Sequence, residues 1–187
     1  MRNPVSYLSP LILVLPTVLF AAKNDTPQHH DAFTPGTADE SKIAREVRHQ
    51  LLTLPYYGVF DDLAFRVDGD TVTLLGATAN TTLKRDAESA IKHVEGVSRV
   101  VNQIDLLPVS SMDDQIRRAV FRAIYGDPAL STIYGYRSIP PIHIIVKNGN
   151  VTLEGVVANQ MDKNLANIRA NSVSGVFSVT NNLMAEK

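Results

Sequence analysis

The sequence contains two copies of one unit, and this duplication constrains the fold more than any other feature. At a constant offset of 79 residues, the segment 63–104 aligns with 142–183 and gives 14 identities in 42 positions without a gap. A unit of this size is long enough for a small domain with its own core. We therefore predict two tandem domains of the same topology within the 187 residues.

The apolar spacing in each copy predicts the order helix, strand, strand, helix, strand. A stripe at every third or fourth residue opens each copy, from Ile43 in the first and from Ile116 in the second. Alternation over 63–74 and 142–153 predicts a hairpin, closed by a type II′ turn at Gly69-Asp70 and a type I′ turn at Asn148-Gly149. We expect an α+β fold, two tandem α-β-β-α-β domains, each a three-stranded mixed sheet with two helices on one face. The third strand can lie parallel to the second or beside the first.

The N-terminus has the features of an export signal. Arg2 precedes an apolar run over 11–20, and Ala21-Ala22 follows as a small-residue cleavage site. An uncleaved membrane anchor is the alternative, although Pro10 and Pro16 interrupt a run that is short for a spanning helix. We divide the chain into a signal peptide at 1–22, a leader at 23–37, domains at 38–107 and 112–185, and a linker at 108–111.

The leader and the cysteine count limit the remaining possibilities. Residues 23–36 are polar, contain proline and glycine, and show neither a helix nor a strand period, so we expect them to be disordered. A thiol nucleophile, a disulfide framework and an N-terminal lipoprotein anchor are excluded because the chain has no cysteine. We predict a periplasmic location.

Both copies close with the same motif, which reads Gly-Val-x-x-Val-x-Asn and then an apolar residue two positions later. A further glycine near the end of the second strand of each copy predicts a backbone bend or close packing. The positions that we assign to the fold are Gly76, Gly96, Val100, Asn102, Gly155, Gly175, Val179 and Asn181.

This pattern resembles the BON domain family over about 39–107 and 113–184, and the tandem arrangement behind a signal peptide is similar to the osmotically inducible periplasmic type. The resemblance implies an α/β sandwich without catalysis, found in the cell envelope and associated with phospholipid surfaces and with osmotic or envelope stress. It supplies no catalytic residues. The longer connection after the first helix of the second copy departs from the first copy and contains most of its tyrosines.

The residues give little support for an enzyme. Beyond the leader only His49, His93 and His143 are present, they fall in different elements, and none has a histidine at the aligned position in the other copy. We therefore predict no catalysis, no cofactor and no metal. Nucleic-acid binding is not expected either, because the net charge is −1 and no basic motif with interleaved aromatics occurs.

Charge distinguishes the copies and indicates a binding surface. The formal charge is −3 over 39–107 and +2 over 112–187. Cations near tyrosines suit the headgroup layer of an anionic membrane, so we predict a peripheral phospholipid-binding or partner-binding surface in the second copy. Its candidate residues are Arg117, Arg118, Arg122, Tyr125, Tyr134, Tyr136, Arg137 and Ile139. The alternative to a binding role is that these residues belong to a solvated helix face next to a packed loop.

Two functions are consistent with the sequence. The first is a non-enzymatic periplasmic module that attaches peripherally to anionic phospholipid and protects the envelope under osmotic or other stress. The second is a protein-interaction or chaperone-like adaptor of the envelope, which would use the open sheet face or the aromatic connection.

Overall fold

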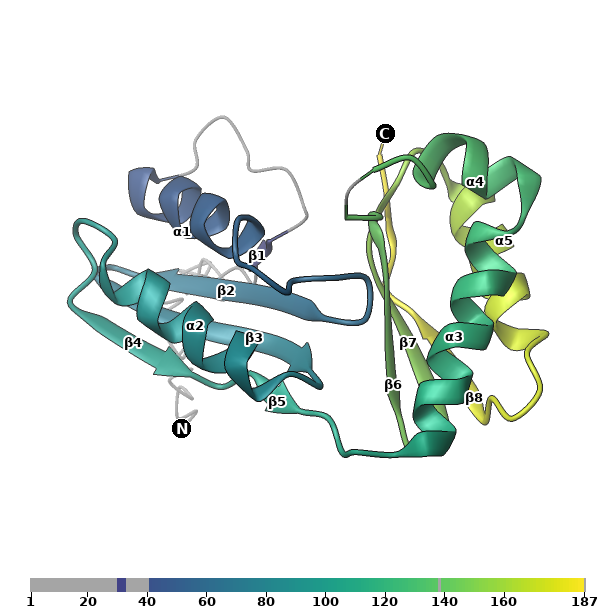
Figure 1. Cartoon of the computed structure of the whole chain (residues 1–187). Helices are drawn as coiled ribbons and strands as arrows, with labels where there is room; N and C mark the ends of the chain where they lie inside the picture. Colours follow the sequence, from purple (N-terminus) through teal and green to yellow (C-terminus); the bar gives the residue numbers. More distant parts are fainter. Residues whose placement is uncertain (1–29, 33–40, 138, 187) are drawn as a thin grey trace, which may run out of the picture.

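The computed structural model describes residues 30–32, 41–137 and 139–186, which form two α/β halves side by side (Figure 1). In each half the helices cover one face of a sheet. The predicted signal peptide and most of the predicted leader lie outside the described residues. Within the part that is described, no helix is both long enough and apolar enough to cross a bilayer.

The first half has two helices and a mixed sheet in the order β2-β3-β4. Its elements are α1 (Lys42–Leu52), β2 (Asp62–Asp68), β3 (Thr71–Thr78), α2 (Thr81–Lys92), β4 (Arg99–Asn102) and β5 (Asp105–Leu106). β2 and β3 are antiparallel, whereas β4 and β5 both run parallel to β3. The third strand therefore lies parallel to the second, and it is interrupted between Asn102 and Asp105.

The second half repeats this topology with the sheet order β6-β7-β8. Its elements are α3 (Ser111–Tyr125), α4 (Pro128–Tyr134), β6 (Ile142–Lys147), β7 (Asn150–Val157), α5 (Gln160–Asn171), β8 (Ser178–Asn181) and β9 (Met184–Ala185). α4 is the addition, and it occupies the longer connection. The Asp127 side chain caps it by accepting from the N–H groups of Ala129 and Leu130, and Pro128 occupies its first turn.

Both predicted hairpin turns are present. Gly69 has φ +62°, as the first position of a type II′ turn requires, while Asn148 and Gly149 have φ +53° and +76°, as a type I′ turn requires. The glycine near the end of the second strand bends the backbone in each copy. At Gly155, where φ is +113°, a Cβ atom would lie 2.0 Å from the carbonyl oxygen of Pro141, so this position accepts no side chain.

Each half has its own apolar core between sheet and helices. In the first, Val47 and Leu51 of α1 pack with strand residues such as Phe65. In the second, Val120 and Ile124 of α3 take the same places. The asparagine of the closing motif ties strand to helix in both copies, because Asn102 donates to the carbonyl of Lys84 and Asn181 to that of Lys163.

A short strand from the leader completes the first sheet. β1 (His30–Asp31) pairs antiparallel with β2, and Ala32 is buried in the first core. The Arg48 guanidinium donates to the Ala32 carbonyl at 3.1 Å. Our prediction of a leader without regular structure was wrong for these residues. Strand pairing at a free edge uses backbone groups, so it needs no side-chain pattern in the sequence.

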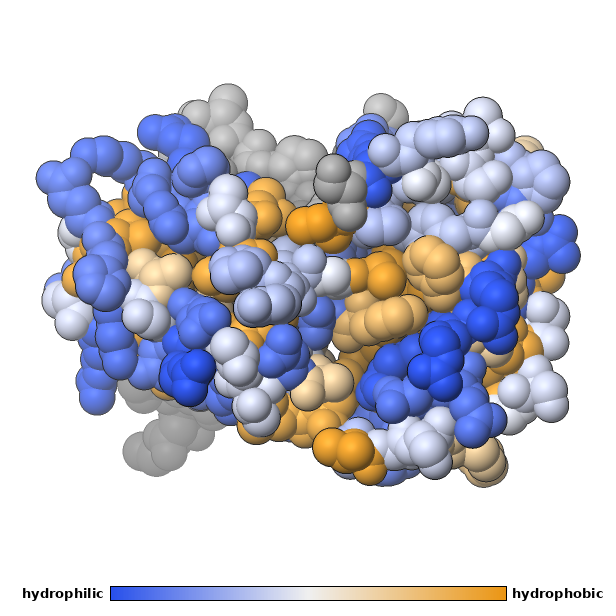
Figure 2. Space-filling model, viewed as in Figure 1, coloured by the Kyte–Doolittle hydropathy of each residue, from blue (hydrophilic) through white to orange (hydrophobic). Residues whose placement is uncertain are grey.

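The two halves are fixed to each other by a reciprocal contact. Val59 and Phe60 of the first half pack against the second core, and Ile139 of the second half packs against the first. The Ile144 N–H donates to the Val59 carbonyl at 2.8 Å, at the free edge of β6. The ring of His143 stacks on Tyr57 with centroids 5.5 Å apart. Figure 2 shows apolar side chains gathered between the halves.

Candidate functional site

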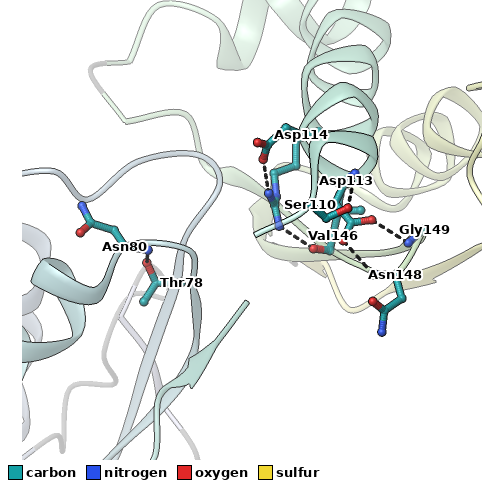
Figure 3. Close-up of polar contacts among 9 residues, drawn as sticks. Thr78, Asn80, Ser110, Asp113, Asp114, Val146, Asn148 and Gly149 are labelled. Atoms are coloured by element: carbon teal, nitrogen blue, oxygen red, sulfur yellow. Dashed lines mark hydrogen bonds and ion pairs between the residues drawn. The ribbon is translucent and has the colours of Figure 1, made fainter. Parts of the chain in front are cut away.

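Arg117 belongs to the internal structure of the second half and not to its surface. The residue is 4% exposed, and its guanidinium forms an ion pair with Asp114 and donates to the Val146 carbonyl at 2.7 Å (Figure 3). Beside it, the Asp113 carboxylate accepts from the N–H groups of Asn148 and Gly149 at 2.9 and 2.8 Å. Together these groups anchor α3 to the β6–β7 hairpin, so our placement of Arg117 on a contact surface was wrong.

Two of the predicted surface tyrosines also face inward. The Tyr125 hydroxyl donates to the Ile142 carbonyl at 2.8 Å, and burial raises the pKa of this phenol. Tyr134 is 3% exposed, and its hydroxyl donates to Asp162 and accepts from the Ala158 N–H. Burial, followed by the contact with Asp162, raises the pKa of Tyr134 to about 12. Both phenols are structural, because their hydroxyl groups are used within the fold.

The rest of the connection is divided between interface and surface. Ile139 packs against the first core, so it is not available to a ligand. Tyr136 is 91% exposed and Arg137 is also exposed. The predicted cluster of aromatic residues is therefore reduced to one exposed tyrosine with an adjacent cation.

Arg118 and Arg122 lie on the exposed face of α3, where Figure 2 shows a hydrophilic strip. A spacing of four residues places both on one side of the helix. Neither forms an ion pair with another described residue, and the same is true of Arg137. Together with Tyr136, these three cations are the part of the predicted surface that the structure leaves accessible.

The carboxylates of the second half are mostly turned inward. Asp113, Asp127 and Asp162 are all buried, and Asp127 accepts an ion pair from Arg169 at 2.6 Å. Asp114 is engaged by Arg117. Because three of the six acidic residues are buried while Arg118, Arg122 and Arg137 are exposed, the surface of this half is more positive than its net charge of +2 indicates.

The second half also exposes large apolar side chains that the sequence reasoning missed. Met161 and Ile168 of α5 are 77% and 60% exposed, and Phe177 before β8 is 88% exposed. The aligned residues of the first half are Thr82, Ser89 and Ser98. A comparison of solvent-facing positions between the copies would have found this difference.

His143 lies at the contact between the halves. It is 1% exposed, and its Nδ1 atom is 2.6 Å from the Asp61 carbonyl oxygen. Burial lowers the pKa of this imidazole to about 4, so the ring is neutral at pH 7. Among the residues that the structure describes, no three histidine, aspartate or glutamate side chains gather into a metal-binding group.

The comparisons with known proteins identify the family. The sequence model of the BON domain matches residues 39–108 and 112–186, which together cover most of the chain. The chain belongs to the BON domain family. The predicted resemblance and the tandem α+β architecture are thereby confirmed, and 39–108 and 112–186 are the first and second BON domains. BON domains are involved in phospholipid binding and envelope stress.

Two solved structures that match the chain are distant in sequence. One is the C-terminal domain of CdsD, a structural protein of the type III secretion system of Chlamydia trachomatis, at 11% identity and a TM-score of 0.28, with 80% of this chain and 100% of that chain covered. A second structure of CdsD gives 11% identity and a TM-score of 0.30, with 79% and 94% covered. No curated protein sequence matches the chain.

Proposed function

We propose that the protein is a non-enzymatic periplasmic module whose second BON domain attaches peripherally to anionic phospholipid and supports the envelope under osmotic or other stress. The observation that carries the proposal is the separation of charge in this domain, in which Arg118, Arg122 and Arg137 face solvent without a carboxylate partner while Asp113, Asp127 and Asp162 are buried. Each basic residue near an anionic bilayer contributes about 1 kcal/mol to attachment.

Exposed apolar groups support the same function. Met161 and Ile168 share a face of α5, which packs beside α3, and Tyr136 adds an exposed phenol. Such side chains enter the headgroup layer when cations hold a domain at the membrane. The first BON domain has polar residues at the positions of Met161 and Ile168, so it is the less suitable membrane contact.

The adaptor function has less support. It relied on an open sheet face or on the aromatic connection. In the second BON domain the open face is covered along β6, where His143 contacts Tyr57 and Asp61 of the first domain and Ile145 is buried. Tyr125 and Tyr134 face inward.

Co-sedimentation with vesicles tests the proposal. The chain should bind vesicles that contain phosphatidylglycerol and should not bind pure phosphatidylcholine, and its binding should weaken as salt rises. The double variant Arg118→Ala/Arg122→Ala should lose about 2 kcal/mol, or roughly thirtyfold in affinity. The control Arg85→Ala/Arg99→Ala removes the same charge from exposed positions of the first domain and should change little.

Absence of binding to either vesicle at low salt would reject the membrane function. A role in stress is tested separately, by growth of a deletion strain at high osmolarity and by the permeability of its envelope. Normal growth and permeability in that strain would reject the stress role. They would not bear on lipid binding, which the vesicle experiment tests.

A further inference from the structure

A groove in the second BON domain lies between α3 and the turn that leads from α5 to β8. Its volume is about 430 Å³, and its lining includes Ile116, Ala119 and Gly175 together with Arg118 and Arg122. Two accessible cations therefore line the groove together with small and apolar groups. Met112 lines the same groove and is 63% exposed.

The first BON domain has a groove of about 400 Å³ at the equivalent place, but it carries carboxylates. Glu46 and Glu95 both line it, and Lys42 forms an ion pair with Glu95 at 2.9 Å across it. The duplication thus provides an internal comparison, because the same fold holds both grooves.

Aligned positions show what has changed between the grooves. Three aligned positions line both grooves, and the pairs, first domain before second, are Lys42 and Gln115, Glu46 and Ala119, and Glu95 and Ser174. Both carboxylates of this set are absent from the second domain. The formal charge of the three positions is −1 in the first domain and 0 in the second, where Arg118 and Arg122 also line the groove.

We propose that this α3 groove binds the phosphodiester of an anionic glycerophospholipid headgroup, with Arg118 and Arg122 as its phosphate ligands. Guanidinium groups suit phosphate because they present several N–H donors in a planar fork. Gln115 and Ser174 add neutral hydrogen-bonding groups to the lining. Met112 at the same groove favours a lipid over a free phosphate, because an exposed thioether can contact the glyceride and acyl part.

This inference rests on the proposed membrane function and names the headgroup site within it. The decisive variant restores the carboxylates of the first domain by Ala119→Glu/Ser174→Glu. The fold accepts glutamate at both places, since Glu46 and Glu95 occupy them in the first domain. The matched control is Thr81→Glu/Ser89→Glu, which adds the same charge to exposed positions of α2 in the first domain, away from the groove and from the α5 face of Met161 and Ile168.

Binding of the full chain to vesicles of phosphatidylglycerol and phosphatidylcholine is measured for the wild type and both variants. We expect the groove variant to lose about tenfold or more in affinity and the control less than threefold. Equal losses would overturn the headgroup site while leaving the membrane function in place. A wild type that does not bind these vesicles would reject the function and the site together.

Titration with soluble glycerol 3-phosphate distinguishes a site for a lipid headgroup from a site for a free phosphate compound. In NMR titrations of the wild type it should shift the amides of Ser174 and Gly175 only at concentrations far above those of the vesicle lipid that saturates binding. Tight binding of glycerol 3-phosphate by a chain that ignores vesicles would mark a free-phosphate site and would overturn the assignment to lipid.

Discussion

His143 makes the fold sensitive to acid, because its imidazole is buried where the two BON domains meet. Burial lowers the pKa of His143 from its ordinary 6.5 to about 4. Since the folded pKa lies below the unfolded one, the stabilisation from the neutral ring is fully present above about pH 7 and is lost as the pH falls toward 4. The loss in free energy of unfolding is about 2 kcal/mol at pH 5 and about 3 kcal/mol at pH 4.

Urea unfolding followed by circular dichroism at pH 7, 6 and 5 measures this loss. Between pH 7 and 5, His143→Gln should lose about 2 kcal/mol less of its free energy of unfolding than the wild type loses. His93→Gln is the matched control, because His93 is exposed on the first domain, and it should follow the wild type.

The Asp61 carboxyl has the opposite effect on stability as the pH falls. The prediction therefore concerns the difference in pH dependence between the wild type and the variants, and not the free energy of unfolding of the wild type alone. Burial raises the pKa of the Asp61 carboxyl, which therefore favours the folded state as the pH falls. This contribution is shared by all three proteins. Identical pH dependence in the wild type and in His143→Gln would refute the reasoning.

Two further substitutions test the internal structure of the second BON domain by its free energy of unfolding in urea. Tyr134→Phe removes a buried hydroxyl bonded to a buried carboxylate and should cost about 1 to 3 kcal/mol, whereas Tyr136→Phe, on a 91% exposed ring, should stay within about 0.5 kcal/mol of the wild type. Gly155→Ala should cost about 3 kcal/mol or more because its Cβ meets a carbonyl oxygen, and Gly69→Ala about 1 to 2 kcal/mol because only the left-handed φ opposes it. Equal costs within either pair would contradict the structure.

The topology could be predicted from the sequence because the same local patterns occur in both copies. The two turn pairs, the bending glycines and the closing asparagines all act through nearby backbone, and each has an aligned counterpart. The open choice for the third strand could not be made from the sequence, since parallel and antiparallel neighbours accept the same short apolar alternation.

The surface was harder to predict, although part of the error was avoidable. Arg117 aligns with Ala44 and stands three and seven residues before Val120 and Ile124, so the buried stripe of α3 already included it. The Asp127-Pro128 pair is a helix start signal, and Tyr134 follows Leu130 by four residues, so a helix here places both side chains on one face. That face is buried.

Contacts between the domains left no signal in the sequence. His143 and Asp61 are 82 residues apart, and the position aligned with His143 is Ala64. Such a pairing depends on how two finished sheets dock, and no periodicity within either copy records it. The same holds for Ile139, whose apolar side chain was assigned to a ligand surface and instead packs on the first core.

Because Val59, Phe60 and Ile139 pack across the contact between the domains, we expect neither BON domain to be stable and soluble when it is separated from the other. Cutting the chain within 108–111 would uncover apolar side chains on both pieces and would leave the edge of β6 without the Val59 carbonyl. Two separately expressed pieces should therefore be poorly soluble alone and should recombine when mixed.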